Sequence, residues 1–284
     1  VQLGLPVEKA LQMATIQPAR CYGLYQLGMI APGRQADFVI LDNVTDLNVV
    51  DVYHCGKRVI RDEKVEVKPC PPHLKNTVHV SGFSEERLKL KHPGGKAHVI
   101  QMLEKQIVTS DVVEEVPWKV LDGEKYFVPD GEYQKIAVIE RHKNTGKMGV
   151  GIVKGYGIRG GAIASSVSHD SHNIIVVGDN DRDMALAVKE MMRTQGGYTL
   201  VRDGEIYGTL PLPVMGLMSD AGYESVNEAL AKMIPKAHEM GVKDGFDPFI
   251  TLSFMALPVI PEIRITPRGI YLVKEDRMLR TPFC

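Results

Sequence analysis

The sequence predicts an α+β fold in two regions, the first of about 70 residues and the second of about 210. Strand-like and helix-like runs follow one another in no regular order, as in α+β proteins. Several apolar runs are joined by short turns rich in Asn, Asp and Gly, which predicts antiparallel hairpins. The proline-rich stretch KPCPPHLKN, at residues 68–76, interrupts both patterns, so we place the boundary between the regions there.

A short helix opens the first region. The segment PVEKALQMAT begins with Pro6, which the first turn of a helix tolerates. One apolar face at helical spacing is formed by Val7, Ala10, Leu11 and Ala14. QPARCYGL predicts another helical turn, and a Pro-Gly turn then leads into a strand at residues 38–41. VVDVYHCGKRVIRDEK predicts a hairpin that turns at Gly56.

In the second region, YQKIAVIERHKNTGKMGVGIVKGYG predicts a hairpin that turns at residues 143–146. NIIVVGDNDRDMALAVKEMMRTQGG predicts a buried strand and then a helix that residues 179–181 cap and Gly196-Gly197 end. A second hairpin turns at Asp203-Gly204. SDAGYESVNEALAKMIPKAHEMG predicts a helix that is kinked or restarted near Pro235. The apolar, proline-containing segment FDPFITLSFMALPVIPE predicts core or a subunit interface.

Composition excludes several classes of partner. The formal net charge of −1 gives no basic field that would attract nucleic acid or an anionic membrane. No apolar run approaches the roughly 18–20 residues that span a bilayer. The four cysteines form no C-x-x-C pair, which argues against a disulfide scaffold or a cysteine zinc site and fits a reducing cytoplasm. Because the chain opens with Val1 in what reads as the middle of a domain, we expect it to be part of a longer polypeptide.

The densest group of chemically capable side chains is SHDSHN, with His169, Asp170, His172 and Asn173. Three interpretations stay open. The segment is an internally hydrogen-bonded loop before a core strand, or a wall or lid of a substrate pocket, or an accessory metal site. The metal interpretation is the weakest, because the i, i+3 spacing favours shared coordination of one metal only on a helix, and the flanks are strand-like.

Three other segments have a functional and a structural interpretation. Arg141 and His142 lie at a hairpin end, where they could bind a nucleobase edge or serve only solubility. VKGYGIRGG could cradle a phosphate, but it matches no phosphate-loop pattern, so close backbone packing explains its glycines better. The acids around GDNDRD would repel a phosphate, so helix capping explains them better than a ligand crevice.

Longer motifs carry a resemblance to known proteins. AT-x-x-PA at residues 14–19, GL at 23–24 and G-x-IAPG-x-x-ADFV-x-LD at 28–42 resemble the end of an amidohydrolase-superfamily chain, where the last barrel helix leads into a small β-sandwich. GAIASSVSHDSHNIIVVGDNDRDMALAV, LPLPVMGLMSD and GFDPFITLSFMALPVIPEIRIT resemble the carboxy-terminal domain of the bacterial adenine deaminase family. Together the two resemblances cover essentially the whole chain.

The resemblance implies an activity and a metal. The reaction would be hydrolytic removal of the 6-amino group of adenine by a metal-activated water, giving hypoxanthine and ammonia in purine salvage. The superfamily holds its divalent metals, here manganese or iron in a binuclear site, in a (β/α)8 barrel with an H-x-H ligand motif. None of the nine histidines forms that motif. We therefore expect no metal in this chain, no certain catalytic residue, and no activity without the missing barrel half.

The resemblance also implies the domain organisation. Residues 1–27 would be the last helical region of the barrel, 28–68 part of a β-sandwich, 69–76 a linker, and 77–284 a mixed α+β carboxy-terminal domain. Strand edges left open in the first region would be covered by the amino-terminal half, a partner subunit or another copy in a homo-oligomer. Two other functions stay open: a non-catalytic binding or scaffold module derived from such an enzyme, and a cyclic-amide hydrolase of the same superfamily.

Overall fold

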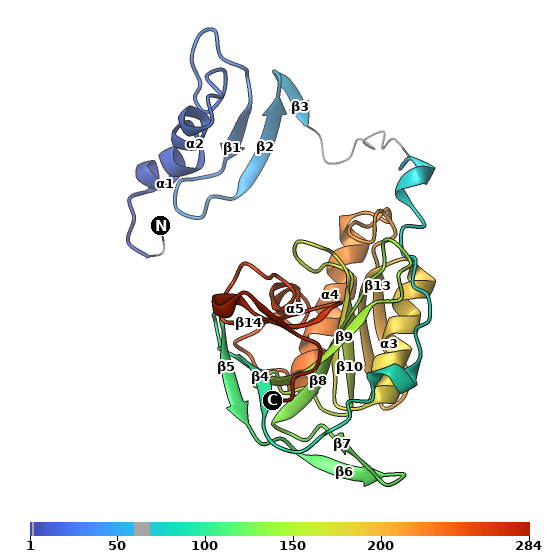
Figure 1. Cartoon of the computed structure of the whole chain (residues 1–284). Coiled ribbons are helices and arrows are strands. Elements are labelled where there is room, and N and C mark those ends of the chain that lie inside the picture. Colours follow the sequence, from blue (N-terminus) through green and yellow to red (C-terminus); the bar gives the residue numbers. More distant parts are fainter. Residues whose placement is uncertain (2, 60–68) are drawn as a thin grey trace. The chain divides into compact units, whose positions relative to one another are not determined.

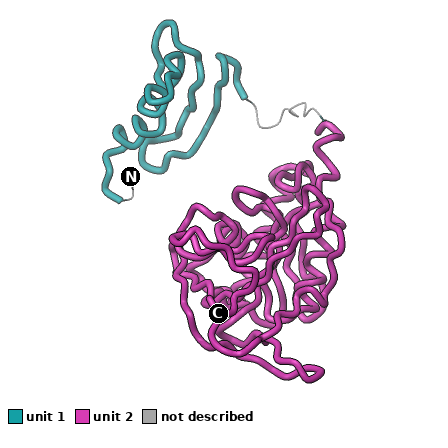
Figure 2. Tube along the Cα trace, in the orientation of Figure 1, with its two compact units in different colours: residues 1–69 teal, residues 70–284 magenta. Residues whose placement is uncertain are grey.

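The computed structural model describes residues 1, 3–59 and 69–284, which form two compact units, residues 1–69 and 70–284 (Figure 2). The boundary between the units falls within the proline-rich stretch that interrupts the sequence patterns. Among the described residues, no helix has the length and the apolar character needed to cross a membrane.

Unit 1 contains two short helices and a three-stranded antiparallel sheet in the order β1-β2-β3. Its elements are α1 (Val7–Ala14), α2 (Ile16–Cys21), β1 (Phe38–Leu41), β2 (Val49–His54) and β3 (Lys57–Val59). All five lie where the sequence predicts them, with the hairpin turning at Cys55-Gly56. The predicted second strand of this hairpin runs on into residues 60–68, which lie outside the described part of the chain.

Unit 1 has almost no interior of its own. The predicted apolar face of α1 is present, but none of the helix's residues is buried. Among the described residues of unit 1, Ala19 alone is a buried hydrophobic residue. The apolar side chains exposed in this unit are many, and they include Leu3, Leu11, Met13, Tyr22, Tyr25, Ile30, Val39 and Val50.

Unit 2 is built on an eight-stranded sheet in the order β13-β12-β10-β11-β8-β9-β4-β5. Neighbours in this sheet are antiparallel except for β4 and β9, which are parallel. The strands are β4 (Ala97–Met102), β5 (Thr109–Glu114), β8 (Tyr133–Ile139), β9 (Met148–Lys154), β10 (Gly161–Ser165), β11 (Ile174–Gly178), β12 (Gly197–Arg202) and β13 (Glu205–Pro211).

Smaller elements surround this sheet. They are β6 (Trp118–Leu121), β7 (Glu124–Phe127), α3 (Asp181–Thr194), α4 (Tyr223–Glu239), α5 (Ile250–Met255), β14 (Ile263–Thr266), β15 (Gly269–Leu272) and β16 (Arg277–Leu279). Three short 3-10 helices, η1 (Pro72–Leu74), η2 (Glu85–Leu88) and η3 (Val273–Glu275), complete the described structure. The mixture of a large, mainly antiparallel sheet with separate helices is the α+β arrangement that the sequence predicts.

Helices cover both faces of the sheet (Figure 1). Successive residues of its central strands point to opposite sides, so each face packs a different set of side chains. On one face, Ala137 and Val176 pack in a cluster with α3. On the other face, Ile136 and Val177 pack with α4, α5 and the β14–β15 hairpin. Strand β11 is therefore apolar and buried along its whole length, as the continuous run IIVV at residues 174–177 predicts.

Local sequence signals account for most of the connections in unit 2. Asn180 caps α3, since its side chain accepts a hydrogen bond from the backbone N–H of Asp183 at 2.8 Å. The β12–β13 hairpin turns at Asp203-Gly204, both with positive φ, as predicted. Of the two alternatives predicted at Pro235, a kink or a restart, the restart is wrong, because α4 is one helix across that residue.

Candidate functional site

The loop that joins β10 to β11 contains the predicted cluster and is held by hydrogen bonds within itself. We call residues 168–173 the His169 loop. The backbone N–H of His172 donates to the carbonyl of Ser168 at 2.5 Å, and the N–H of Ser168 points back to Nδ1 of the His172 ring at 3.3 Å. Asn173 is buried, and its amide nitrogen donates to the hydroxyl of Ser171. The loop is therefore ordered by its own polar groups, as the structural interpretation of SHDSHN requires.

Two imidazole rings and one phenyl ring meet at the surface of this loop. The ring centroids of His169 and His172 lie 5.6 Å apart in an edge-to-face arrangement. His169 also lies 5.4 Å from the ring of Phe254 in α5. Burial lowers the pKa of His172, and the nearby His169 and Arg141 lower it further. Near neutral pH, His172 is therefore mainly uncharged and can accept as well as donate a hydrogen bond.

Arg141 lies at the end of the β8–β9 hairpin, as predicted, but it is buried beneath the His169 loop, so for Arg141 the solubility interpretation is wrong. Its side chain is 1 % exposed, and the guanidinium donates to the backbone carbonyls of His172, Thr77 and Met215. Gly216 leaves room for it, because a Cβ there would lie 2.8 Å from the guanidinium. Burial lowers the pKa of Arg141 to about 10. Arg141 therefore joins three segments that are distant in sequence.

The other predicted residues lie around the same loop. The backbone N–H of Arg141 donates to the Asn173 side chain at 3.3 Å, and the ring of His142 is 2.6 Å from the carbonyl of Ser171. His142 and Asp170 are exposed at the surface. All six predicted residues thus gather at one place in the fold, although Arg141 and His142 come from the β8–β9 connection.

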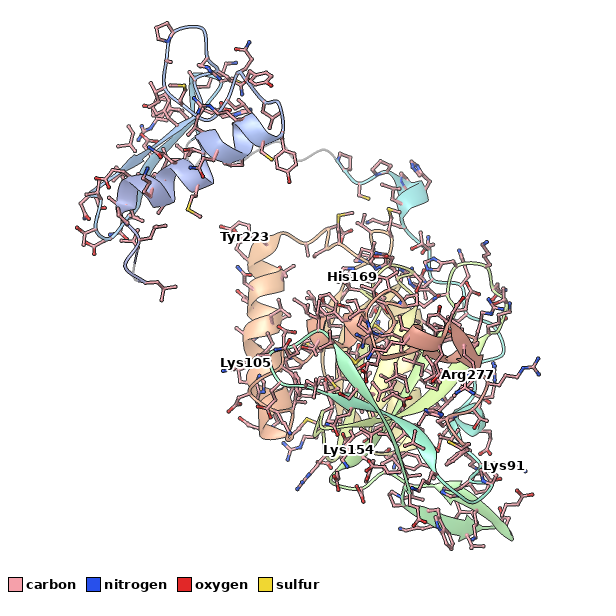
Figure 3. The ribbon with its side chains drawn as sticks, turned by 60° about the vertical axis from the view of Figure 1, so that its left-hand side comes forward. Lys91, Lys105, Lys154, His169, Tyr223 and Arg277 are labelled. Carbon is pink, nitrogen blue, oxygen red and sulfur yellow. The ribbon has the colours of Figure 1, made fainter. Side chains whose placement is uncertain are left out.

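The surface beside the loop is partly apolar. Met215 and Ile250 are 43 % and 49 % exposed. The backbone carbonyls of Met215 and His172 both accept hydrogen bonds from the guanidinium of Arg141. Ile250 lies one helical turn before Phe254. Ser168, next to His169, carries a buried hydroxyl that has no hydrogen-bond partner among the described residues. His169 lies at the opposite end of unit 2 from Lys91 (Figure 3). This end of unit 2 offers imidazole, aromatic and apolar groups side by side, a combination that suits a flat heteroaromatic ligand.

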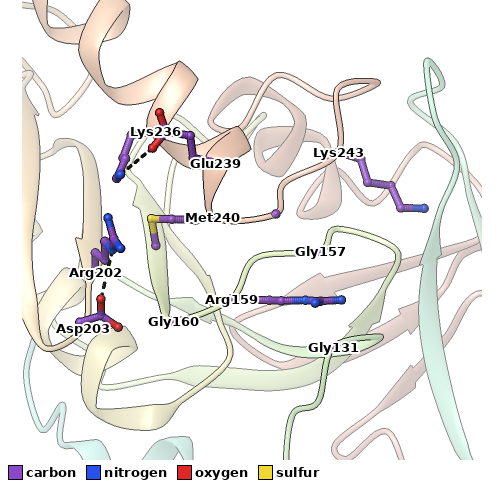
Figure 4. Close-up of a pocket in the computed structure, with 11 residues that line it drawn as sticks. Gly131, Gly157, Arg159, Gly160, Arg202, Asp203, Lys236, Glu239, Met240 and Lys243 are labelled. Atoms are coloured by element: carbon purple, nitrogen blue, oxygen red, sulfur yellow. Dashed lines mark hydrogen bonds and ion pairs between the residues drawn. The ribbon is translucent and has the colours of Figure 1, made fainter.

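A separate hollow of about 590 Å³ lies between the glycine-rich segment 155–161 and the end of α4 (Figure 4). Lys236 pairs with Glu239 and Arg202 with Asp203, while the guanidinium of Arg159 has no side-chain partner among the described residues. None of the six predicted site residues lines this hollow.

The glycines at this hollow serve packing between backbones. Gly157 and Gly241 face each other so closely that a Cβ on Gly157 would lie 2.3 Å from the carbonyl oxygen of Gly241. The N–H groups of Gly160 and Gly161 donate to the carboxylate of Asp179. These groups are thus already used within the protein, which confirms close packing as the reason for the glycines of VKGYGIRGG.

The acids of GDNDRD also have internal partners. Asp179 holds the glycine N–H groups, and Asp181 pairs with the ammonium of Lys135, which is only 2 % exposed. Burial lowers the pKa of Lys135, and the neighbouring carboxylate of Asp181 opposes that shift. The structural interpretation of this turn is therefore correct, with Asn180 as the cap.

Metal ligands gather at a different place from the His169 loop. Within the described part of the chain, one group of three His, Cys or acidic residues brings its ligand atoms within 4.8 Å of one another. It consists of Asp37, His54 and Cys55, all exposed, in unit 1. His169, Asp170 and His172 do not form such a group. Sequence reasoning missed this trio, because Asp37 is 17 residues away from His54 and only the pairing of β1 with β2 joins them.

Comparison with known proteins connects this fold to named relatives. Residues 106–277 match the family described as adenine deaminase C-terminal domain, and residues 1–68 match the amidohydrolase family. The chain is 51% identical over 280 residues to the adenine deaminase of Desulfitobacterium hafniense, covering 99% of this chain and 48% of that protein. It is 44% identical over 278 residues to the adenine deaminase of Nitratidesulfovibrio vulgaris, covering 96% of this chain and 48% of that protein.

A third relative, the adenine deaminase of Clostridium acetobutylicum, is 42% identical over 283 residues, which is 97% of this chain and 49% of that protein. The chain thus spans about half the length of the curated relatives that it matches. The family match covers most of unit 2, including the His169 loop and the helices that pack on both faces of the sheet. By this match, the chain is a member of the adenine deaminase C-terminal domain family.

Proposed function

We propose that this chain is the carboxy-terminal half of an adenine deaminase, an enzyme that hydrolyses adenine to hypoxanthine and ammonia in purine salvage. The observation that carries the proposal is the 51% identity over 99% of this chain to a protein named adenine deaminase, of which it covers only 48%. The match to an amidohydrolase family at residues 1–68 supports the assignment to a hydrolase with a metal-dependent barrel.

In this proposal the catalytic metals, manganese or iron in a binuclear site, belong to the amino-terminal half. The donors present in this chain do not fit such a site. No H-x-H occurs among the nine histidines. The ligand trio in unit 1 is exposed, includes a thiol, and offers three donors, which is too few to surround two ions. We therefore assign no catalytic step to residues of this chain.

Unit 1 supports association with another polypeptide segment. Only Ala19 among its described hydrophobic residues is buried, whereas a folded domain normally has a continuous apolar core. We propose that residues 1–27 supply the last helical region of the barrel and residues 28–68 part of a β-sandwich. The amino-terminal half, or another copy in a homo-oligomer, then covers the exposed apolar side chains. A cytoplasmic location belongs to the same proposal and rests on the four free cysteines.

The His169 loop is proposed as a wall or lid of the adenine pocket. His169 and Phe254 provide ring faces on which a purine can stack, and His172 provides a neutral imidazole that can hydrogen-bond to its edge. The loop can bind, orient and exclude water, which matters because a misplacement of about 1 Å can cost on the order of 100-fold in rate. Asp170 and Asn173 belong to the loop, Arg141 holds it, and His142 flanks it.

The test uses the complete polypeptide that contains this chain. Its release of ammonia is measured with adenine, adenosine and dihydroorotate as substrates. Turnover of adenine alone supports the proposal. Turnover of dihydroorotate but not of adenine would identify a different amidohydrolase. Turnover of none of the three substrates would favour a non-catalytic binding module.

The loop has a separate test in the same protein. His169→Ala should lower kcat/KM for adenine by about 10-fold or more through a poorly held substrate, with an unchanged unfolding midpoint. His73→Ala, at an exposed histidine in η1, is the matched control and should keep both values. Unchanged kinetics in His169→Ala would remove the loop from the pocket without affecting the assignment of the reaction.

A further inference from the structure

The open end of the sheet in unit 1 brings a carboxylate, an imidazole and a thiol together. Asp37 lies just before β1, His54 ends β2, and Cys55 occupies the first position of the β2–β3 turn. Oδ1 of Asp37 lies 3.1 Å from Nδ1 of His54, and the Cys55 sulfur lies 3.6 Å from Nε2 of the same ring. One ligand atom from each of the three residues lies within 4.8 Å of the other two.

The backbone fixes this arrangement before any ligand binds. The N–H of Cys55 donates to Oδ1 of Asp37 at 2.7 Å, and the N–H of Gly56 donates to the carbonyl of Ala36 at 2.8 Å. The neighbouring pair Phe38 and Tyr53 is in register across β1 and β2, with stacked rings 4.5 Å apart. The turn is thus tied to the start of β1 by two hydrogen bonds from backbone N–H groups, and the three ligand side chains project from this tied end.

The donor set selects a class of metal. Imidazole and thiolate together suit zinc and related transition ions, whereas magnesium and calcium prefer oxygen donors alone. Ligand bonds of about 2.0–2.3 Å around a tetrahedral ion separate neighbouring donor atoms by roughly 3.3–3.8 Å. A single ion bonds to one nitrogen of the His54 ring, whereas Nδ1 faces Asp37 and Nε2 faces the Cys55 sulfur. The imidazole, which is 69% exposed, therefore has to turn so that one nitrogen faces the ion, and one ligand atom from each residue already lies within 4.8 Å of the others.

We propose that Asp37, His54 and Cys55 form a zinc-class metal site that closes the end of the unit 1 sheet, with water as the fourth ligand. This site is independent of the proposed deaminase reaction. Metal binding contributes directly to folding where a small unit lacks a core, because the site exists only in the folded state. Unit 1 is such a unit, since Ala19 alone is a buried hydrophobic residue among its described residues. The metal would join residues on both sides of the β1–β2 pairing.

The experiment uses the 284-residue chain with Cys21→Ser, Cys70→Ser and Cys284→Ser, so that Cys55 is the only thiol. Co²⁺ is added as the probe, because it replaces Zn²⁺ and its bond to a thiolate gives a near-ultraviolet charge-transfer band. We expect one Co²⁺ per chain, a thiolate band, and displacement of Co²⁺ by Zn²⁺. Bound metal should also slow proteolysis of residues 1–59.

Variants in this background identify the ligands. Cys55→Ser should abolish the thiolate band. His54→Gln and Asp37→Asn should each weaken Co²⁺ binding at least tenfold, since the loss of even an outer-shell partner commonly costs about that much. His73→Gln is the matched control and should bind like its parent.

Three results would overturn the site. One is the absence of a thiolate band at Co²⁺ excess in the single-thiol chain. Another is Co²⁺ binding by His54→Gln and Asp37→Asn with the same thiolate band and the same affinity as the single-thiol parent, which would mean that the thiol binds the ion alone. The third is a band that appears only with dimerisation, which would mean that two copies share the ion.

Discussion

Arg141 donates a hydrogen bond from its guanidinium to the backbone carbonyl of His172, and no carboxylate forms an ion pair with this buried cation among the described residues. Its other donors reach the carbonyls of Thr77 and Met215. A buried arginine bonded only to backbone oxygens fixes the relative position of the chain segments that supply them. The placement of His169 and His172 therefore depends on a residue in a different loop.

Replacement of Arg141 by methionine should destabilise unit 2. The variant keeps most of the side-chain volume but leaves three backbone carbonyls without their donor, so we expect a loss of about 2–4 kcal/mol in the free energy of unfolding. Urea denaturation measures this loss, and hydrogen exchange should show faster exchange at residues 168–173. Arg268→Met is the control, since Arg268 is exposed and its side chain has no described partner. Equal stability of the two variants would contradict the anchoring role.

Glu140 should make the stability of the β8–β9 connection depend on acid pH. Burial raises the pKa of this carboxyl, but hydrogen bonds from the backbone of Thr145, Lys143 and His142 and from the Thr145 hydroxyl outweigh that effect and lower it to about 2. The carboxylate therefore stabilises the fold above about pH 4.5, and this contribution is lost as the pH falls towards 2.

The measurement is urea unfolding at pH 5 and pH 3. The parent protein should lose about 1–2 kcal/mol more than Glu140→Gln between these two values, after allowance for solvent screening. Glu115→Gln changes an exposed carboxylate with no described partner, and it should keep the pH dependence of the parent. An identical pH dependence in both variants would show that the Glu140 hydrogen bonds do not matter.

The cap of α3 should be worth about 1–2 kcal/mol. In Asn180→Ala the backbone N–H of Asp183 loses its acceptor, and the carboxylates of Asp179 and Asp183 lose the amide that donates to both at 2.9 Å. Thermal unfolding compares this variant with Asn227→Ala, in which an exposed position within α4 loses the same side chain. We expect Asn227→Ala to be neutral or slightly stabilising; a comparable loss in both would refute the cap.

Comparison of two glycines with nearly the same backbone φ distinguishes the cost of backbone strain from the cost of steric crowding. Gly157 has a φ of 97° and faces Gly241, whereas Gly94 has a φ of 100° and open space within 4 Å of the position that a Cβ would take. Alanine at Gly94 should cost about 1–2 kcal/mol from backbone strain alone. Alanine at Gly157 should cost a further 1–3 kcal/mol, roughly, because the chains must move apart. Equal unfolding free energies for the two variants would disprove the close approach.

Local elements were predictable from the sequence because their signals are local. The strand at residues 38–41, the Asp203-Gly204 turn and the capped helix at 181–194 each follow from residues within a few positions of one another. The order of the eight-stranded sheet was not predictable, since the parallel pairing of β4 with β9 joins residues about 50 positions apart.

The candidate site was predictable only in part. SHDSHN identifies the loop, but nothing near Arg141 signals its burial, because its three acceptors are backbone carbonyls that any residue type could supply. Phe254 was likewise missed as a neighbour of His169, because the contact depends on how α5 packs on the sheet. Side chains that meet through tertiary packing leave no spacing pattern in the sequence.

The uneven burial of the two units has a practical consequence for dividing the parent polypeptide into separately produced pieces. Unit 2 contains three apolar clusters, whereas unit 1 buries Ala19 alone among its described hydrophobic residues. In the proposed enzyme, a cut between Pro69 and Cys70 would keep unit 1 with the proposed amino-terminal half and would release unit 2 with its interior intact. In the same proposal, a piece that begins at Val1 has the apolar side chains of unit 1 uncovered, so we expect it to be less soluble than unit 2 alone.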